Sequence, residues 1–197
     1  DRLRSLVTDM IRRRVAAIAG NTVAMQAAKP ATTTIPIVFF TGGDPVEAGL
    51  VASLNRPGGN ITGISFLGAA LGAKRLELLR KLVPNATTIG LLANPSPDAE
   101  WERRDVQAAA QAVGQQLIIV YASSDGDIER AFGAFVQRGA GAVFSSTGAF
   151  MINNRERVVA LAAQHALPAS YALREAVEAG GLISYGPSFS DALRQVG

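Results

Sequence analysis

The sequence contains no cysteine and a single histidine, His165. The absence of cysteine excludes disulfide bonds, thiolate metal ligands and every mechanism that needs a cysteine nucleophile. Any Ser-His-Asp arrangement would depend on His165, which lies at the end of an expected helix over residues 155–165. Because a cation interacts favourably with the dipole at that end of a helix, we interpret His165 as structural and not catalytic.

The sequence motifs of common enzyme classes are also missing. There is no G-x-x-x-x-G-K-[ST] phosphate loop, no G-x-G-x-x-G after a strand and no G-x-S-x-G elbow. No group of His, Asp and Glu has the spacing of a metal site. The carboxylates Glu100, Glu102 and Asp105 stand beside Arg103 and Arg104 on an expected helix, which indicates a solvated surface. We therefore predict a protein without enzymatic activity, cofactor or metal.

Long apolar runs and concentrated charge are absent as well. No window approaches the roughly 18 apolar residues of a membrane span. The formal net charge is +3, from 19 Lys and Arg against 16 Asp and Glu. The basic residues are scattered except for the run Arg12, Arg13 and Arg14, which is typical of the solvated end of a helix. Since a nucleic-acid binder would concentrate its basic residues on one face, we expect no nucleic-acid partner.

The sequence does contain a regular alternation of apolar, strand-like runs with amphipathic, helical runs. Continuous apolar runs such as residues 88–93 predict strands that are buried on both faces. The alternation predicts an α/β fold built from doubly wound parallel sheets. Helices are expected between the strands, including one over residues 46–54. The expected strands are residues 15–19, 35–40, 61–66, 88–93, 116–121, 142–145, 169–172 and 182–185.

The alternating units fall into two sets, which predict two lobes. Residues 1–62 together with 186–197 form a partial first lobe, and residues 63–185 form the second lobe. The extended segments 61–66 and 183–187 are expected to carry the chain from one lobe to the other.

A polar loop follows almost every expected strand. The carboxyl ends of parallel strands share one edge of a sheet, and ligands of α/β folds bind at that edge. Hydroxyl and amide groups there would bond a small polar ligand, helix N-termini would favour an anion, and Asp44 could pair with an ammonium group. The alternative is that these residues only cap the helices that follow them. The candidate ligand-binding residues are Asn21, Thr22, Thr41, Gly42, Gly43, Asp44, Asn94, Ser96, Ser123, Thr147, Phe150 and Tyr171.

Three segments of the sequence resemble one protein family. The loop TGGDPV, the segment LNRPGGNITG and the segment EAGGLISYGP carry the likeness, within residues 35–84 and 167–195, and residues 1–15 are similar too. They resemble the ABC-transporter substrate-binding proteins of the tryptophan/tyrosine-binding type. The resemblance implies a type I periplasmic-binding-protein fold, with Asn21, Thr22, Thr41 to Asp44, Asn94, Thr147 and Tyr171 in the cleft between two lobes.

The resemblance also implies a role. The expected ligand is a small polar molecule, namely an amino acid, for which the resemblance favours an aromatic one. The expected partner is an ABC permease in the membrane. The expected location is periplasmic, or extracytoplasmic with a lipid anchor. An effector-sensing domain of a two-lobed transcription regulator is the alternative. A doubly wound enzyme is the third possibility, which the missing motifs disfavour.

Compared with the family, the chain lacks some expected parts. Members normally begin with a signal peptide and a strand-helix-strand unit that precedes the segment starting at Asp1, and they continue past Gly197. We therefore expect the first lobe to be incomplete, with an apolar sheet edge exposed beside the strand over residues 15–19. We expect the chain to self-associate through that edge.

Overall fold

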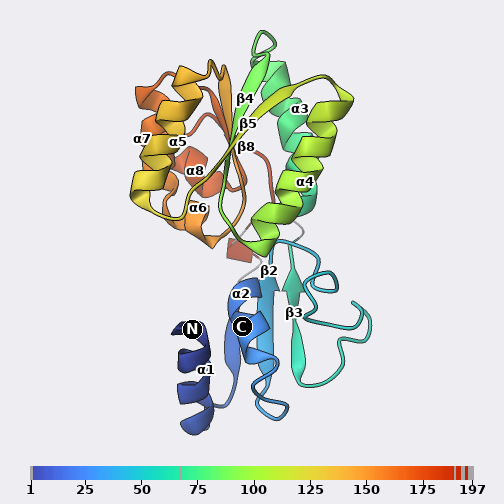
Figure 1. Ribbon diagram of the computed structural model, residues 1–197. Coiled ribbons are helices and arrows are strands. Elements are labelled where there is room, and N and C mark those ends of the chain that lie inside the picture. The colour runs from blue at the N-terminus through green and yellow to red at the C-terminus, as the bar shows by residue number, and fades with distance from the viewer. Residues whose placement is uncertain (1, 67, 189, 192–193, 195–197) are drawn as a thin grey trace. The chain divides into compact units, whose positions relative to one another are not determined.

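The chain folds into two compact units in the computed structural model, which describes residues 2–66, 68–188, 190–191 and 194 (Figure 1). The first unit comprises Asp1–Leu67 with Phe189–Gly197, and the second comprises Gly68–Ser188. The expected lobes had their boundaries after residues 62 and 185, so the observed units divide a few residues later at both places.

The first unit contains one parallel sheet, in the order β1-β2-β3. Ile18, Ile37 and Ile61 lie side by side at the start of the three strands and are all buried. The second helix packs on β1 and β2, and the first helix packs on the second. The elements are α1 (Arg2–Arg12), β1 (Ile18–Asn21), α2 (Thr22–Ala28), β2 (Ile37–Thr41) and β3 (Ile61–Ser65).

The first strand begins later than expected, because α1 ends in a cap that takes up Val15. The amide of Val15 donates to the carbonyl of Met10, and that of Arg14 donates to Ile11. Arg14 has a positive φ of 52°. This pair of bonds is a Schellman cap, and it keeps Val15 at the end of the helix and out of the sheet.

The helix expected over residues 46–54 is replaced by a single turn. Asp44 begins the turn by accepting the amide of Val46 at 2.7 Å. The amide of Leu50 then donates to Pro45, and that of Gly49 donates to Val46, with Gly49 at a φ of +68°. Gly49 can adopt this conformation without strain, so the same kind of cap ends the helix after one turn.

The segment over residues 61–66, expected to cross between lobes, supplies β3 of the first sheet instead. Its residues pair in parallel with β2 from Ile61 to Ser65. Gly63 is required there, because a Cβ at that position would lie 2.1 Å from the carbonyl oxygen of Phe39. The close approach of the two strands therefore depends on a residue without a side chain.

The second unit is a doubly wound parallel sheet, as predicted, and its strand order is β5-β4-β6-β7-β8. Two apolar clusters fill its core, one on each face of the sheet. In Figure 1, α3 and α4 lie on one side of this sheet and α5 and α7 on the other. The strands are β4 (Thr88–Ala93), β5 (Gln116–Tyr121), β6 (Ala142–Ser145), β7 (Ala169–Tyr171) and β8 (Ile183–Ser184). The helices are η1 (Gly68–Leu71), α3 (Gly72–Leu82), α4 (Pro97–Ala112), α5 (Asp125–Gln137), α6 (Ala149–Asn153), α7 (Arg155–Gln164) and α8 (Arg174–Glu178).

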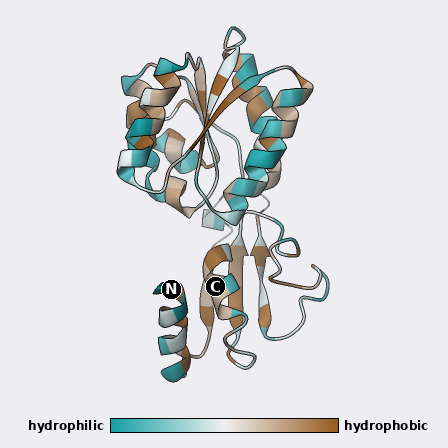
Figure 2. Cartoon of the chain, in the orientation of Figure 1, coloured by the Kyte–Doolittle hydropathy of each residue, from teal (hydrophilic) through white to brown (hydrophobic). Residues whose placement is uncertain are grey.

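Burial in the second unit follows the hydropathy of its elements. The strands β4 and β6 are apolar and lie inside, while the helices turn polar residues outwards (Figure 2). Phe135 of α5 packs against the strand at Gly90, where a Cβ would lie 2.6 Å from the ring. The missing side chain of Gly90 therefore makes room for an aromatic ring in the core.

Candidate functional site

The strand order of the second unit places a switch point between β4 and β6. These strands are neighbours, with Leu92 opposite Ser145, but the chain leaves them for helices on opposite faces of the sheet. Ligands of doubly wound proteins bind in the crevice that this arrangement creates at the carboxyl ends of the strands. The candidate site of the second unit is therefore the pair of loops after Ala93 and after Ser145.

The two loops meet at Gly148. A Cβ on Gly148 would lie 3.0 Å from Oδ1 of Asn94 and 3.2 Å from Oγ of Ser96, so a larger residue would push the loops apart. Ser96 caps α4 by accepting the amide of Ala99. The Oδ1 atom of Asn94 is buried and has no hydrogen-bond partner within the described residues. The fold thus brings Asn94 and Ser96 against the loop that carries Thr147.

A buried ion pair contacts the loop after β6. Arg75 of α3 and Glu102 of α4 pair with each other, and both side chains are 0% exposed. The carboxylate of Glu102 also accepts the amide of Thr147. The expectation that Glu102 is a solvated surface residue was wrong, because the residue lies on the buried face of α4 together with Ala99 and Val106.

Burial opposes the charge on both members of this pair. It raises the pKa of Glu102, against the lowering effects of Arg75 and of the Thr147 amide. It likewise lowers the pKa of Arg75, against the raising effect of Glu102. Each charge therefore depends on the other for its stability inside the unit.

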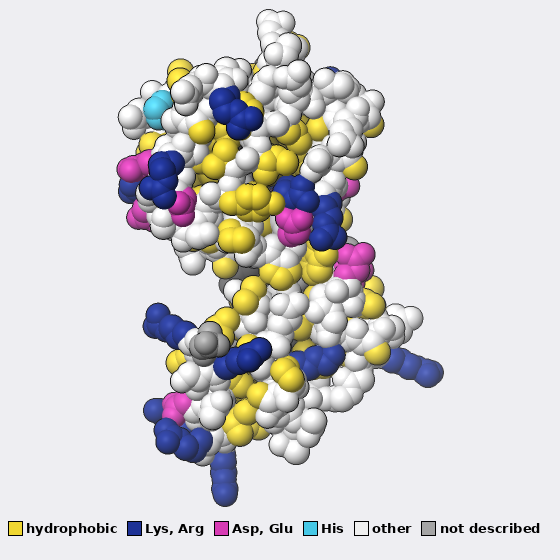
Figure 3. Space-filling model, viewed as in Figure 1, with side chains coloured by type: hydrophobic (Ala, Val, Ile, Leu, Met, Phe, Trp, Pro, Cys, Tyr) yellow, Lys and Arg dark blue, Asp and Glu magenta, His cyan; other side chains and the backbone are white. Residues whose placement is uncertain are grey.

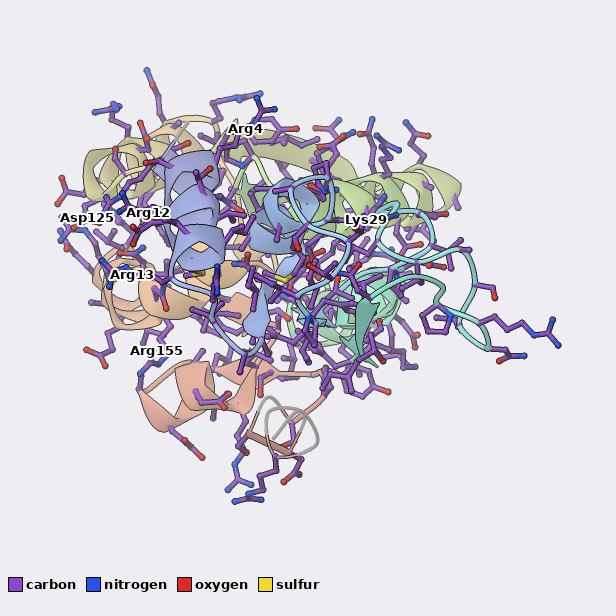
Figure 4. All side chains as sticks on the ribbon, turned by 90° about the horizontal axis from the view of Figure 1, so that it is seen from below. Arg4, Arg12, Arg13, Lys29, Asp125 and Arg155 are labelled. Carbon is purple, nitrogen blue, oxygen red and sulfur yellow. The ribbon has the colours of Figure 1, made fainter. Side chains whose placement is uncertain are left out.

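A small concavity lies beside this loop, at the carboxyl ends of β6 and β7. Its lining is mainly apolar and includes Ser146, whose hydroxyl is buried and has no partner in the part of the chain that the structure describes. Arg155, labelled in Figure 4, supplies the one positive charge of the lining and donates to the carbonyl of Ile152 at 3.1 Å. The lining residues are Ser145, Ser146, Met151, Ile152, Arg155, Tyr171, Ala172, Leu173 and Ala176.

Most residues of this concavity were not candidates on sequence grounds. Tyr171 is the one member that the sequence pattern predicted. Arg155 offered a signal, because it opens α7, and a cation at the start of a helix is disfavoured by the dipole. Such a placement suggests another role for the charge. Ser146 was passed over for Thr147, although Ser146 is the residue that directly follows β6.

Three further candidates of the second unit have mainly structural surroundings. Tyr171 is 4% exposed and belongs to a core cluster, and burial raises its pKa to about 12. Phe150 is half-buried and packs against the same cluster. The amide of Ser123 donates to the carboxylate of Asp127 at 3.0 Å at the start of α5, beside the edge strand β5 and away from the switch point.

The candidates of the first unit gather at the carboxyl ends of β1 and β2. Asn21 caps α2 by accepting the amide of Ala24. The hydroxyl of Thr22 donates to that of Thr41 at 2.8 Å, and both residues are buried. Thr41 also accepts the amide of Gly43, which follows the buried Gly42. The carboxylate of Asp44 caps the following turn, so one of its oxygens already accepts amides where a ligand ammonium was expected.

The described residues give no sign of two other kinds of site. They include no group of three His, Cys, Asp or Glu side chains that could hold a metal ion. None of their helices is long and apolar enough to cross a membrane. Basic side chains are spread over the visible face of the first unit (Figure 3), and Arg12 and Arg13 at the end of α1 are solvated and pair with Asp9 (Figure 4).

Solved structures with the same fold are known. A conserved domain protein from Vibrio cholerae matches with a TM-score of 0.86 at 26% identity, over 98% of this chain and 65% of that one. The ABC domain from Streptococcus pneumonia in complex with L-Trp matches with a TM-score of 0.83 at 23% identity, over 98% and 67%. These likenesses confirm a fold of the type I periplasmic-binding-protein kind.

The sequence comparisons agree with the fold. A tyrosine-binding protein from Clostridioides difficile is 48% identical over 77 residues, which are 39% of this chain and 21% of that protein. The chain thus spans about a fifth of that relative and about two thirds of the Vibrio protein. The family model described as ABC transporter substrate binding protein matches residues 2–192. The chain therefore belongs to the family of ABC-transporter substrate-binding proteins.

Proposed function

We propose that the chain is a ligand-binding part of an ABC import system and that it binds an amino acid, preferably an aromatic one. The observation that carries the proposal is the pair of buried, unpartnered polar atoms, Asn94 Oδ1 and Ser146 Oγ, at the switch point of the second unit. Buried polar atoms in proteins almost always have partners, so an unsatisfied pair at such a position favours a ligand-binding role.

The neighbouring concavity suits the chemistry of an amino acid. Arg155 offers a positive charge for a carboxylate. Met151, Ile152 and Leu173 offer apolar surface for a side chain. The relatives that bind tyrosine and L-Trp support an aromatic ligand. In this proposal Asn21, Thr22 and Thr41 to Asp44 of the first unit are ligand-binding residues too. The protein catalyses nothing, works outside the cytoplasm and has an ABC permease as its partner.

Ligand binding is expected to raise the thermal unfolding midpoint of the 197-residue chain. At about a hundredfold excess over Kd, L-tyrosine or L-tryptophan would add roughly 2.7 kcal/mol to the stability of the folded form. Differential scanning fluorimetry against a panel of amino acids and small carboxylates measures the shift. The variant Arg155→Gln is expected to weaken binding at least about tenfold, because it removes a charge-assisted hydrogen bond to the ligand carboxylate.

The matched control is Arg157→Gln, two residues further along α7. Arg157 is half-exposed and pairs with Glu129 and Asp125, outside the concavity. Its replacement is expected to leave the affinity unchanged. Absence of a shift with every aromatic, branched-chain and carboxylate probe would contradict the proposed function.

Self-association through β1 is also part of the proposal. Among the described strands, β1 pairs with β2 alone, so its other edge has no strand beside it. The amide of Ile18 donates to the carbonyl of Pro36, which directly precedes β2. Because successive residues of a parallel strand direct their backbone N–H and C=O groups to opposite edges, those of Ala19 point to the free edge. Such an edge is a template for a second copy of the chain.

Ala19→Pro is expected to reduce self-association, because it removes a donor from the free edge and leaves the bonds to β2 in place. Light scattering of the chain over a range of concentrations measures the change. The control Leu54→Asp removes an exposed apolar side chain from a loop and should leave the association intact. A wild-type chain that stays monomeric at high concentration would refute this part of the proposal.

A further inference from the structure

The buried ion pair of Arg75 and Glu102 is joined to the ends of two strands. A guanidinium nitrogen of Arg75 donates to the carbonyl of Ser145, the last residue of β6, and lies 3.3 Å from the carbonyl of Ser170 in β7. Its guanidinium also stands 4.1 Å above the ring of Phe144. The pair thus links α3 and α4 to the carboxyl edge of the sheet, at the strands that line the candidate site.

The same pair contacts the loop after β6. The amide of Ser146 donates to Leu92 of the neighbouring strand at 2.9 Å, and the amide of Thr147 donates to the carboxylate of Glu102. Gly148 then follows with a φ of +121° and begins α6. Two consecutive amides are therefore held by named acceptors, one of which is the buried carboxylate.

A contribution to folding stability alone does not explain why such a pair is present. The desolvation free energy of two buried charges offsets much of their mutual attraction. Apolar residues of similar volume often stabilise a core equally well. Unlike apolar side chains, a guanidinium and a carboxylate form directional hydrogen bonds, and each of them bonds particular backbone atoms. Here those atoms belong to the loop that carries Ser146 and to the strand ends beside it.

We propose that the Arg75–Glu102 pair is a positioning device, which holds the Ser146–Gly148 loop so that Ser146 and Asn94 present their polar atoms to the ligand. The inference rests on the proposed function, and it assigns to Arg75 and Glu102 a role through the loop, without ligand contact. Both atoms presented, Ser146 Oγ and Asn94 Oδ1, are buried without a hydrogen-bond partner among the described residues, a state that the Nε atoms of Arg75 and Arg157 share. A shift of this loop would redirect Ser146 Oγ and change the packing of Gly148 against Asn94, and ligand affinity would fall.

The test is the double variant Arg75→Met with Glu102→Leu, which replaces the pair by apolar residues of similar size. We expect its unfolding midpoint to recover relative to each single variant, while its affinity for L-tyrosine or L-tryptophan, by isothermal titration calorimetry, stays at least about tenfold below that of the wild type. Hydrogen exchange at the Thr147 amide, measured by NMR without ligand, should be at least about tenfold faster.

A surface pair on the same helix supplies the control. Arg103 and Glu100 pair on α4 with partial exposure, and the double variant Arg103→Met with Glu100→Leu should keep both affinity and Thr147 protection. A double variant of the buried pair that binds like the wild type, or that protects Thr147 equally well, would overturn the inference. If the wild type itself binds neither probe, the proposed function fails, and Thr147 exchange still decides whether the pair holds the loop.

Discussion

Replacing Phe135 with Ala is expected to lower the free energy of unfolding of the second unit by about 3–5 kcal/mol. The ring is 0% exposed and meets Phe132 edge-on, with ring centres 5.9 Å apart. It also fills the space above Gly90. Truncation removes the burial of the ring and the aromatic contact, and it leaves a cavity that the surrounding sheet cannot close.

Urea unfolding followed by the fluorescence of Trp101 measures this change. Trp101 is the sole tryptophan of the chain and lies in α4, so its signal reports on the second unit. The control is Val136→Ala, on the next residue of the same helix, whose side chain is 49% exposed. Its effect should stay within about 0.5 kcal/mol. A loss below about 1 kcal/mol for Phe135→Ala would show that the ring is not a core anchor.

The sheet of the second unit was largely predictable from the sequence. Continuous apolar runs bounded by turn residues placed three strands at residues 88–93, 116–121 and 142–145, the bounds that β4, β5 and β6 have in the structure. The runs of β4 and β6 are buried in the middle of the sheet, so their hydropathy distinguishes them from their surroundings, while β5 at the sheet edge is only partly buried. The polar loops that follow them belong to the same strand ends, which is why the sequence pattern proposes Asn94 and Thr147 as candidates.

The first unit was harder to predict because local caps override the apolar pattern there. Val15 is apolar and lies shortly before β1, yet its amide belongs to the cap of α1. Gly49 was a usable signal, since a glycine after a short helical run often ends a helix. Arg14 was not, because a positive φ is rare for arginine and nothing in its sequence neighbours predicts it.

The ion pair was missed because its partners are far apart in the sequence. Glu102 stands among charged neighbours, and its partner Arg75 comes from another helix. One local signal existed: Glu102 shares the buried stripe of α4 with Ala99, Val106 and Ala110. A carboxylate at helical spacing with apolar residues is a candidate for a buried charge, and such a charge requires a partner.

Replacing Arg75 alone with Met is expected to lower the free energy of unfolding of the second unit by about 3–5 kcal/mol at neutral pH. Met fills a similar volume, so the loss comes from the carboxylate of Glu102, which stays buried without its counter-charge. The carbonyls of Ser145 and Ser170 lose their donor as well. The control Arg104→Met removes an exposed cation beside Glu100 on α4 and should change stability by no more than about 0.5 kcal/mol.

The difference in free energy of unfolding between Arg75→Met and the wild type should decrease as the pH falls. Burial already raises the pKa of Glu102, and loss of Arg75 removes the main influence that lowers it. A carboxyl whose pKa is raised in the folded protein takes up a proton there before it does so in the unfolded chain, so the folded variant gains stability as the pH falls through that raised value. Urea midpoints of variant and wild type should therefore converge between pH 8 and about pH 5. A difference that stays constant over this range would mean that Glu102 remains charged without Arg75. The hydrogen bond from the Thr147 amide would then be sufficient to stabilise the buried carboxylate.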